Sequence, residues 1–220
     1  MIFDLGGGTF DVTLANVNGK DIEVITSKGD KNLGGTDFDK EIANLISKKY
    51  KKEKNKDLNV DNALLEKAER IKRILSTRDI ASEVIDGPEG PLKIDITRDE
   101  FETSISSFLE KIKMVLEVVL DDSNTESSAI SEILLVGGST RSPCIVKLIE
   151  AKLGKSPLKG VNVDEAVACG AAIRAGMLSL DKLNPAQRRS MENVKLSDVC
   201  NHYLGTIAQV FNESTNRYES

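Results

Sequence analysis

Apolar and polar positions alternate along the first thirty residues, which is the pattern of β-strands. Apolar residues mark the segments 1–5, 10–14 and 22–25, and the last two are separated by Asn18-Gly19. Asn-Gly is a strong hairpin signal because both residues tolerate positive φ. The sequence therefore predicts three successive strands, the second and third joined by a tight turn.

After Gly34-Gly35 the apolar spacing becomes that of amphipathic helices. One helix follows these glycines and ends in a basic run, 48–56, and a second helix covers about 61–76. A hairpin follows, with Gly87–Gly90 as its turn. We interpret the basic run as a solvated helix end, with a docking patch for a protein partner as the alternative. The apolar stripes are Phe38, Ile42, Leu45 and Ile46 in the first helix, and Leu64, Ala68, Ile71 and Leu75 in the second.

The second half of the chain surrounds one short apolar strand with helices. Thr97 and Glu100 form a capping box, and the apolar spacing after it predicts one long helix. The segment 133–136 is apolar throughout, as expected of a strand in the middle of a sheet covered on both faces. Further helices are predicted over about 143–153 and 164–178.

This order of elements predicts an α/β fold with an inserted α+β piece at roughly 34–105. The segment 184–192 is predicted as loop or short helix, and 194–218 as linker followed by strand-like sequence. The chain enters a strand pattern directly at Met1-Ile2-Phe3, without a basic, apolar leader. We therefore expect it to have been cut from a longer protein.

Composition narrows the function classes. The 220 residues are 40% hydrophobic and 30% charged, a normal globular profile. The net charge of −5 argues against general binding of nucleic acid or anionic membranes, so phosphate affinity must come from a local site. Three cysteines and one histidine, His202, argue against structural zinc and His-based nucleophiles. We expect Cys144, Cys169 and Cys200 to be reduced and mostly packed, in a reducing compartment.

The glycine turn at 6–8 is the strongest candidate for chemistry. Three glycines let the backbone approach a ligand, and successive amides can point at a phosphate. Thr9 can donate to a phosphate oxygen. Asp4 and Asp11 flank the turn and could hold the water shell of Mg²⁺, which needs only one or two carboxylates. A plain hairpin with two exposed acids is the alternative.

Two further features could contact a nucleotide. The turn at 137–141 joins a strand to a helix, where free amides collect, although an ordinary turn would look the same. The predicted second helix carries a polar stripe. Its Glu and Ser side chains could bind a sugar, and its Arg side chain could stack on a base. A solvated helix face is the alternative. That stripe consists of Glu69, Lys72, Arg73 and Ser76.

The last predicted helix has a capping acid and a surface of small side chains. Asp164 is a natural N-cap, with water-mediated ligand contact as the alternative. The small side chains suit close packing on a sheet, and they are Ala166, Gly170, Ala171, Ala175 and Gly176.

Taken together, five segments resemble the nucleotide-binding domain of the seventy-kilodalton heat-shock chaperones. They occur in the order and spacing of that family across about 1–180. The segments are IFDLGGGTFDVTL at 2–14, LGGTDFD at 33–39, AERIKRILS at 68–76, ILLVGGSTRSP at 133–143 and NVDEAVACGAAIRAG at 162–176.

The resemblance implies an actin-like ATPase fold, of which this chain would be the second lobe. A ribonuclease-H-like base subdomain would comprise 1–33 and 106–182, and an inserted α+β subdomain would comprise 34–105. Residues 183–220 would lead into the interdomain linker and the incomplete start of a peptide-binding domain. The first lobe, with the other phosphate loop and the catalytic lysine, would be absent.

The resemblance also implies roles for individual residues. Asp4 and Asp11 would hold hydrated magnesium and potassium and, with Thr9, form the catalytic group. The second phosphate loop would be Gly6, Gly7, Gly8 and Thr9. The adenosine-contacting helix face would be Glu69, Lys72, Arg73 and Ser76. The adenosine loop would be Gly137, Gly138, Ser139, Thr140 and Arg141, with Arg141 on adenine. Asp164 would be a further acid of the nucleotide site.

Three departures from the family pattern stand out. Thr36 occupies a position that is usually acidic, and Ser142 replaces an aliphatic residue. The linker-like segment 194–199 is poor in leucine, which argues against strong docking of the linker and so against interdomain coupling.

The function implied is that of an ATP-dependent chaperone fragment using ATP/ADP, Mg²⁺ and K⁺. Hydrolysis in the parent would be coupled to binding of unfolded peptides. The partners implied are such peptides, J-domain co-chaperones, and nucleotide exchange factors on 34–105. We expect a cytoplasmic location, with an organellar parent left open, and little hydrolysis by this fragment alone. The alternatives are a non-hydrolysing, nucleotide-sensing exchange-factor relative and, more distantly, a sugar kinase.

Overall fold

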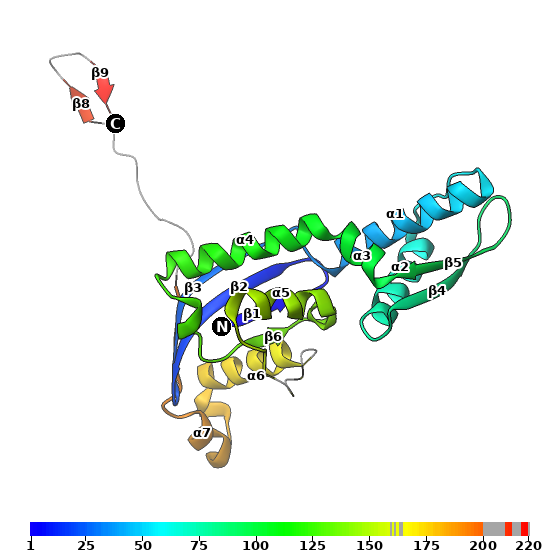
Figure 1. Ribbon diagram of the computed structural model, residues 1–220. Coiled ribbons are helices and arrows are strands. Elements are labelled where there is room, and N and C mark those ends of the chain that lie inside the picture. Colours follow the sequence, from blue (N-terminus) through cyan, green and yellow to red (C-terminus); the bar gives the residue numbers. More distant parts are fainter. Residues whose placement is uncertain (159, 161, 163–164, 200–209, 213–216, 220) are drawn as a thin grey trace.

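The computed structural model describes residues 1–158, 160, 162, 165–199, 210–212 and 217–219. Figure 1 shows a base built on one sheet, with an elongated group of helices and a hairpin at one end of it. The helices and the mixed sheet make the fold α/β, as the element order predicts. Within the described residues, no helix is long and apolar enough to cross a membrane.

Five strands form the mixed sheet of the base: β1 (Ile2–Leu5), β2 (Phe10–Asn18), β3 (Asp21–Asp30), β6 (Leu134–Val136) and β7 (Lys195–Ser197). Their order is β6-β1-β2-β3-β7. The three successive strands are confirmed, since β1, β2 and β3 pair antiparallel and Gly19 takes φ 60° in the turn between β2 and β3. The two edge strands, β6 and β7, pair parallel with β1 and β3.

The expected central position of the apolar strand is wrong. Among the described strands, β6 lies at an edge of the sheet. An apolar run reports that both faces of a strand are covered and says nothing about its lateral neighbours. The Leu158 amide donates to Ile133 O at 2.8 Å, so Leu158 lies beside the residue that precedes β6.

α4 (Ser106–Asp122) packs on the sheet, and other helices lie around the sheet. α4 contacts β2, β3 and α5 (Pro143–Leu153). In Figure 1, α4 runs above the sheet and α6 (Ala166–Leu178) below it, with α7 (Pro185–Met191) beyond α6. The described residues of this part also form short 3₁₀ turns: η1 (Ser127–Ala129), η2 (Gly138–Arg141) and η3 (Leu180–Lys182).

The long helix predicted after the capping box is two helices. α3 (Arg98–Ser104) ends at Ile105, whose φ of −96° and ψ of 8° depart from helical values, and α4 begins after it. Ser104 lies at this break, and its hydroxyl donates to Phe101 O at 2.7 Å. Such local bonds compete with regular helix, and the apolar spacing does not reveal them.

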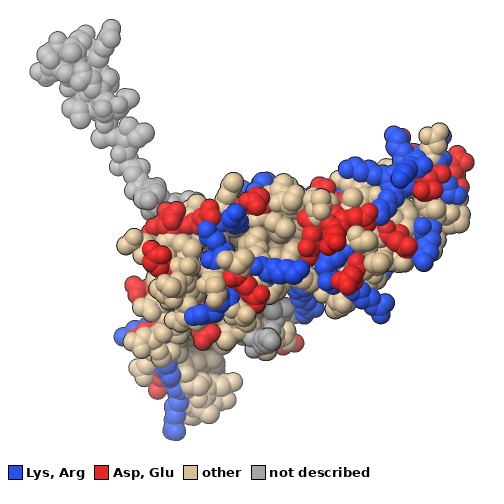
Figure 2. Space-filling view, in the orientation of Figure 1, with Lys and Arg blue, Asp and Glu red and all other residues tan. Residues whose placement is uncertain are grey.

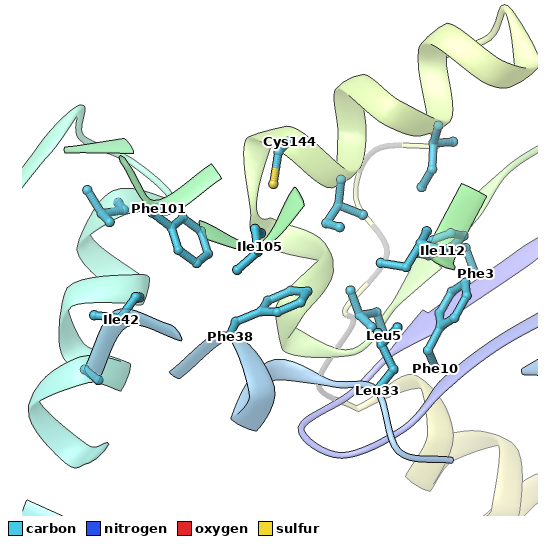
Figure 3. Close-up of a cluster of buried hydrophobic side chains, with 14 of the residues drawn as sticks. Phe3, Leu5, Phe10, Leu33, Phe38, Ile42, Phe101, Ile105, Ile112 and Cys144 are labelled. Carbon is cyan, nitrogen blue, oxygen red and sulfur yellow. The ribbon is translucent and has the colours of Figure 1, made fainter. Parts of the chain in front are cut away.

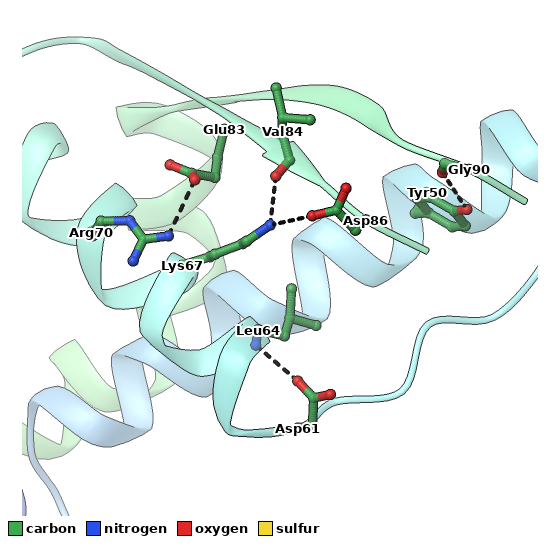
Figure 4. Close-up of polar contacts among 9 residues, drawn as sticks. All are labelled: Tyr50, Asp61, Leu64, Lys67, Arg70, Glu83, Val84, Asp86 and Gly90. Carbon is green, nitrogen blue, oxygen red and sulfur yellow. Dashed lines mark hydrogen bonds and ion pairs between the residues drawn. The ribbon is translucent and has the colours of Figure 1, made fainter. Parts of the chain in front are cut away.

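The insert contains two long helices and a hairpin, as predicted: α1 (Gly35–Lys54), α2 (Asn62–Leu75), β4 (Ile80–Ile85) and β5 (Leu92–Thr97). Figure 4 shows polar contacts that tie the helices to the hairpin. Lys67 Nζ donates to Val84 O at 2.7 Å, and Arg70 pairs with Glu83 at 3.2 Å. The buried Tyr50 donates its hydroxyl hydrogen to Gly90 O at 2.9 Å.

One hydrophobic cluster joins the insert to the base (Figure 3). Phe38 of α1 lies 6.3 Å from Phe101 of α3 and 6.0 Å from Phe108 of α4, between ring centroids. Phe3 and Phe10 continue the cluster under the glycine turn, with their centroids 4.8 Å apart. The insert is thus anchored through a shared core in addition to its chain connections.

The basic run at the end of α1 is only partly a solvated surface. Lys49 donates to Asp95 O at 2.6 Å and pairs with Glu100 at 2.7 Å, while Lys51 pairs with Asp57 at 2.8 Å. Figure 2 shows lysines and arginines gathering over this end of the molecule. Lys49 therefore lies in an ion pair at the surface and is only partly solvated, and the docking alternative stays a hypothesis.

The cysteines and the small-residue helix differ from expectation. Cys144 is buried, which raises the pKa of its thiol, but Cys169 is exposed, and Cys200 lies outside the described residues. Most small residues of α6 are exposed, so the expected packing on the sheet is wrong. Gly176 instead lies against Met191 of α7, where a Cβ would meet the methionine sulfur at 2.5 Å.

The leucine-poor linker segment is docked, contrary to expectation. β7 pairs with β3 through Asp21–Lys195, Ile22–Leu196 and Glu23–Ser197. Lys20, in the β2–β3 turn, donates from Nζ to Ser190 O at 3.2 Å and to Glu192 O at 2.9 Å. The carbonyl of Lys20 accepts from the Lys195 amide at 3.0 Å.

The position of the Lys20 ammonium at the carboxyl end of α7 is also favoured by the helix dipole. Polar contacts to one lysine thus help to hold the leucine-poor segment. Farther along, β8 (Val210–Asn212) pairs antiparallel with β9 (Arg217–Glu219).

We predict that Lys20→Met speeds hydrogen exchange of the amides at 195–197 about fivefold, since the two lost charge-assisted bonds contribute about 1 kcal/mol at this exposed position. Exchange measured by mass spectrometry tests this. Lys31→Met, at the far end of β3, is the control and should change nothing at β7. Equal exchange in the Lys20 variant and the wild type would show that strand pairing alone holds β7.

We also predict a pH-dependent contribution from Glu100. Burial raises the pKa of its carboxyl, but the Lys49 ammonium and bonds from Thr97 together lower it below the usual value of 4.5. The stabilisation is therefore present above pH 4.5 and is lost as the pH falls through the lowered value. Because the pair is more than a third exposed at Glu100 and is screened by solvent, Glu100→Gln should cost about 0.5 kcal/mol at pH 7. The gap to wild type should narrow in denaturant titrations as the pH falls through the lowered pKa of Glu100. A constant gap would contradict this, and Glu66→Gln on the exposed side of α2 is the control.

Candidate functional site

The glycine turn between β1 and β2 is held from two sides. The Gly6 amide donates to Thr9 O at 3.0 Å and closes the turn. Gly6 O accepts from the Gly35 amide at 2.9 Å and from Ser139 Oγ at 3.0 Å. Gly7 O accepts from the Thr36 amide at 2.7 Å. A plain hairpin tip would have no such bonds, so this turn is a junction of three chain segments. Gly7, Gly8 and Thr9 are exposed at its tip.

The segments that flank the turn need glycine because their backbones lie close to neighbouring atoms. A Cβ at Gly34 would lie 2.5 Å from Gly7 O, and a Cβ at Gly35 would overlap Ser139 Oγ. Gly137 has φ 84°, and a Cβ there would overlap Leu5 O. The sequence predicts Gly34 and Gly35 as a break before a helix and as part of the family-like segment 33–39, without assigning them a contact. The doubling of glycine at this point was the available signal for close packing.

Asp4 and Asp11 are paired residues of β1 and β2. The pKa of the Asp4 carboxyl is raised, first by burial and then by the Asp11 charge. Gly29 on β3 leaves room for the Asp11 carboxylate, since a Cβ there would overlap it. Among the described residues, no group of three or more acidic, His or Cys side chains could cage a metal. Two carboxylates fit a Mg²⁺ ion that keeps most of its water.

A cavity of about 600 Å³ lies beside the glycine turn and brings together most of the predicted nucleoside contacts. The polar stripe of α2 forms one wall, and η2 forms the opposite wall. Phe38 and Asp39 line it as well and were not predicted from the sequence. The predicted residues that line it are Gly7, Glu69, Lys72, Arg73, Ser76, Gly138, Ser139 and Arg141.

The remaining predicted residues lie elsewhere. Thr9 and Asp11 line a neighbouring groove of about 660 Å³. Thr140 is buried, and its hydroxyl donates to Gly137 O at 2.7 Å, so it holds the turn. Asp164 lies outside the described residues, and the predicted capping and ligand roles for it stay predictions.

The polar stripe of α2 also makes internal bonds. Arg73 pairs with Glu69 at 2.7 Å, and Ser76 Oγ donates to Arg73 O at 2.6 Å. Lys72 pairs with Asp39 at 2.8 Å. The stripe therefore combines both sequence interpretations, because its ion pairs stand on the wall of a cavity.

Thr36 and Ser142, which depart from the family pattern, both line this cavity. Thr36 contributes its side chain beside Gly7, and Ser142 is buried with its hydroxyl 3.2 Å from Cys144 Sγ. Small hydroxyls thus stand where the family pattern has an acid and an aliphatic group, which leaves this wall less charged and less apolar.

The comparison with protein families gives a match along the whole chain. The family model described as Hsp70 protein matches residues 1–220. The chain belongs to the Hsp70 family. The resemblance inferred from five segments is thereby confirmed, and Hsp70 membership implies an actin-like ATPase fold for this α/β chain.

Curated relatives agree with this membership. This Hsp70 chain is 41% identical over 188 residues to the chaperone protein dnaK of Emiliania huxleyi, covering 81% of this chain and 30% of that protein. It is 38% identical over 217 residues to the chaperone protein dnaK of Cyanidium caldarium, covering 93% and 33%. The chain thus spans about a third of the length of the curated relatives it matches. These names give no support to an exchange-factor relative.

We predict that Gly35→Ala lowers the free energy of unfolding by about 1–3 kcal/mol, because the added methyl group overlaps Ser139 and crowds Lys72. Gly138→Ala is the matched control, since a Cβ there meets nothing within 4 Å. Urea titration of both variants measures the difference. Equal midpoints for the two alanine variants would show that the junction tolerates a side chain.

Proposed function

We propose that this chain is the second lobe of the nucleotide-binding domain of an ATP-hydrolysing Hsp70 chaperone. Residues 1–33 and 106–182 form its ribonuclease-H-like base, 34–105 its inserted subdomain, and 183–220 the linker region and the start of the peptide-binding domain. The observation that supports this best is the cavity lined jointly by α2, η2 and the glycine turn.

In this proposal adenosine lies between the polar stripe of α2 and the η2 turn. Arg141 stacks on adenine, Glu69 and Ser76 bind the ribose, and amides of the glycine turn with Thr9 face the phosphates. Asp4 and Asp11 hold hydrated Mg²⁺, with K⁺ as the second cation the family implies. Phosphoryl transfer depends mainly on positioning and charge neutralisation. Since a catalytic lysine would come from the first lobe, we expect this chain alone to hydrolyse ATP poorly.

Coupling to peptide binding would pass through β7. In the parent, the docked segment 195–197 connects the β3 edge to a peptide-binding domain that takes unfolded or extended peptides, and J-domain co-chaperones would act on the same cycle. Its docking on β3 supports this despite its few leucines.

Nucleotide exchange factors would bind the insert, 34–105. Because adenosine would lie between α2 of the insert and η2 of the base, tilting the insert would separate the two walls. A partner shifts that equilibrium by its differential affinity for the tilted state.

The test is ADP affinity of the full-length parent protein, measured calorimetrically. Arg141→Ala should weaken ADP binding about two- to fivefold, the value of a cation–π contact near a surface. The matched control is Arg70→Ala, an arginine of α2 that pairs with Glu83 of the hairpin. Unchanged affinity in the Arg141 variant, or an equal loss in the control, would remove the assignment of this cavity to adenosine.

A further inference from the structure

The linker-like strand β7 has little of its own to hold it on the sheet. All of its residues are exposed, and Leu196, its one apolar side chain, is 40% exposed. Backbone bonds at such an exposed edge open easily, because water competes for both partners and no apolar burial supports them. The support for its docking must therefore come from the residues around it.

The helix before β7 supplies part of this support. α7 ends at Met191, and β7 begins at Lys195. Between them Asn193 takes φ 68°, the left-handed conformation that commonly follows a helix end, and the Val194 amide donates to Met191 O at 3.2 Å. This tight turn leaves little freedom between helix and strand, so the position of α7 fixes where β7 begins.

α7 is itself packed on the last turn of α6, which it adjoins in Figure 1. Gly176 of α6 is buried under the Met191 side chain, and a Cβ on this glycine would lie 2.5 Å from the methionine sulfur. Leu183 contributes to the same contact, 3.6 Å from that Cβ position. Arg188 Nε also donates to Leu180 O at 3.0 Å. An apolar contact and a directional bond thus hold α7 against α6 and η3.

The carboxyl end of α7 reaches the sheet as well. Lys20, in the β2–β3 turn, donates from Nζ to the carbonyls of Ser190 and Glu192, and its own carbonyl accepts from the Lys195 amide. α7 therefore bridges α6 and the edge of the sheet on which β7 lies.

We propose that α7 is a latch that couples the docking of β7 on β3 to the position of α6, with the packing of Met191 on Gly176 as its anchoring contact. While that contact holds, the end of α7 presents its carbonyls to Lys20 and starts β7 in register with β3. When α6 moves relative to β3, the two contacts of α7 separate, and β7 loses its support. The latch adds a regulatory step to the coupling proposed above and rests on that function for its purpose, but the latch itself can be tested without nucleotide.

The test is hydrogen exchange of the nucleotide-free chain, followed by mass spectrometry for the amides at 195–197. Met191→Ala should speed their exchange about threefold or more, because α7 loses its contact with α6. Met191→Leu keeps the apolar bulk and should retain most of the protection. The matched control is Met114→Ala, which removes an exposed methionine of α4 and should leave these amides unchanged.

A pair of glycine variants tests the other side of the contact. Alanine raises helix propensity at Gly176 and at Gly170 of α6, but only at position 176 would the new Cβ displace Met191. Gly176→Ala should therefore speed exchange at 195–197, and Gly170→Ala should not. Combining Gly176→Ala with Met191→Ala should add little to either single variant, because both remove one contact.

Two results would overturn the latch. Unchanged exchange at 195–197 in both Met191→Ala and Gly176→Ala would show that β7 stays docked without α7. A uniform rise over the whole chain in both variants would show only a loss of global stability.

A second measurement separates the latch from the proposed function. In the full-length parent, Met191→Ala should reduce about threefold the ratio of the peptide dissociation constants with ATP and with ADP, since a linker that is docked less often transmits less. Arg189→Met, at an exposed position of α7, is the control. An unchanged ratio in Met191→Ala would overturn the regulatory role. If the wild type shows no difference between the nucleotides, the proposed coupling fails, while the exchange experiment still decides the latch.

Discussion

The carbonyl oxygens of Gly6 and Gly7 are the point on which this structure depends. They accept bonds from the amides of Gly35 and Thr36, and Ser139 adds its hydroxyl. The start of α1 and the η2 turn, more than a hundred residues apart in the chain, thus meet at Gly6 and Gly7. Such a junction requires residues without side chains, which explains why glycines occur at 34, 35 and 137 as well as in the turn itself. The cavity beside it exists because the three segments are held at fixed distance.

The junction is polar and the support beneath it is apolar. Phe3 and Phe10 pack below the glycine turn, and Phe38 carries the same cluster into the insert. The base and the insert therefore meet through two kinds of contact, backbone bonds at the surface and aromatic packing below. Backbone bonds are directional, whereas aromatic packing tolerates small rotations better. A limited tilt of the insert would therefore strain the junction before it disrupts the core.

Much of this fold follows from the sequence because periodicity reports burial. The stripe of α2 and the alternation in β2 both reflect residues that are buried in the structure, and the Asn-Gly turn specified the hairpin. Periodicity fails where burial does not distinguish the outcomes. Periodicity could not show that β6 is an edge strand or that the helix is interrupted at Ile105. It also could not show that the segment of β7 is held by a lysine.

The sequence predicts many of the residues that line the candidate cavity, but it does not predict the contacts among them. Glu69 and Arg141 lie on one cavity as the family motifs imply. The ion pair of Lys72 with Asp39 was out of reach, because its two members are thirty-three residues apart and neither pattern nor motif links them. Contacts of long sequence separation depend on the final packing of α1 on α2, which local signals do not encode.

The parallel pairing of β7 has a consequence for the edge of the sheet. While Lys195–Ser197 lies on β3, the polar backbone groups of Asp21–Glu23 have a partner within the same chain. When that segment leaves, a twisted but open strand edge faces the solvent, and such edges recruit strands from other molecules. Release of the linker would thus create a surface prone to self-association, unless another segment of the parent protein takes its place.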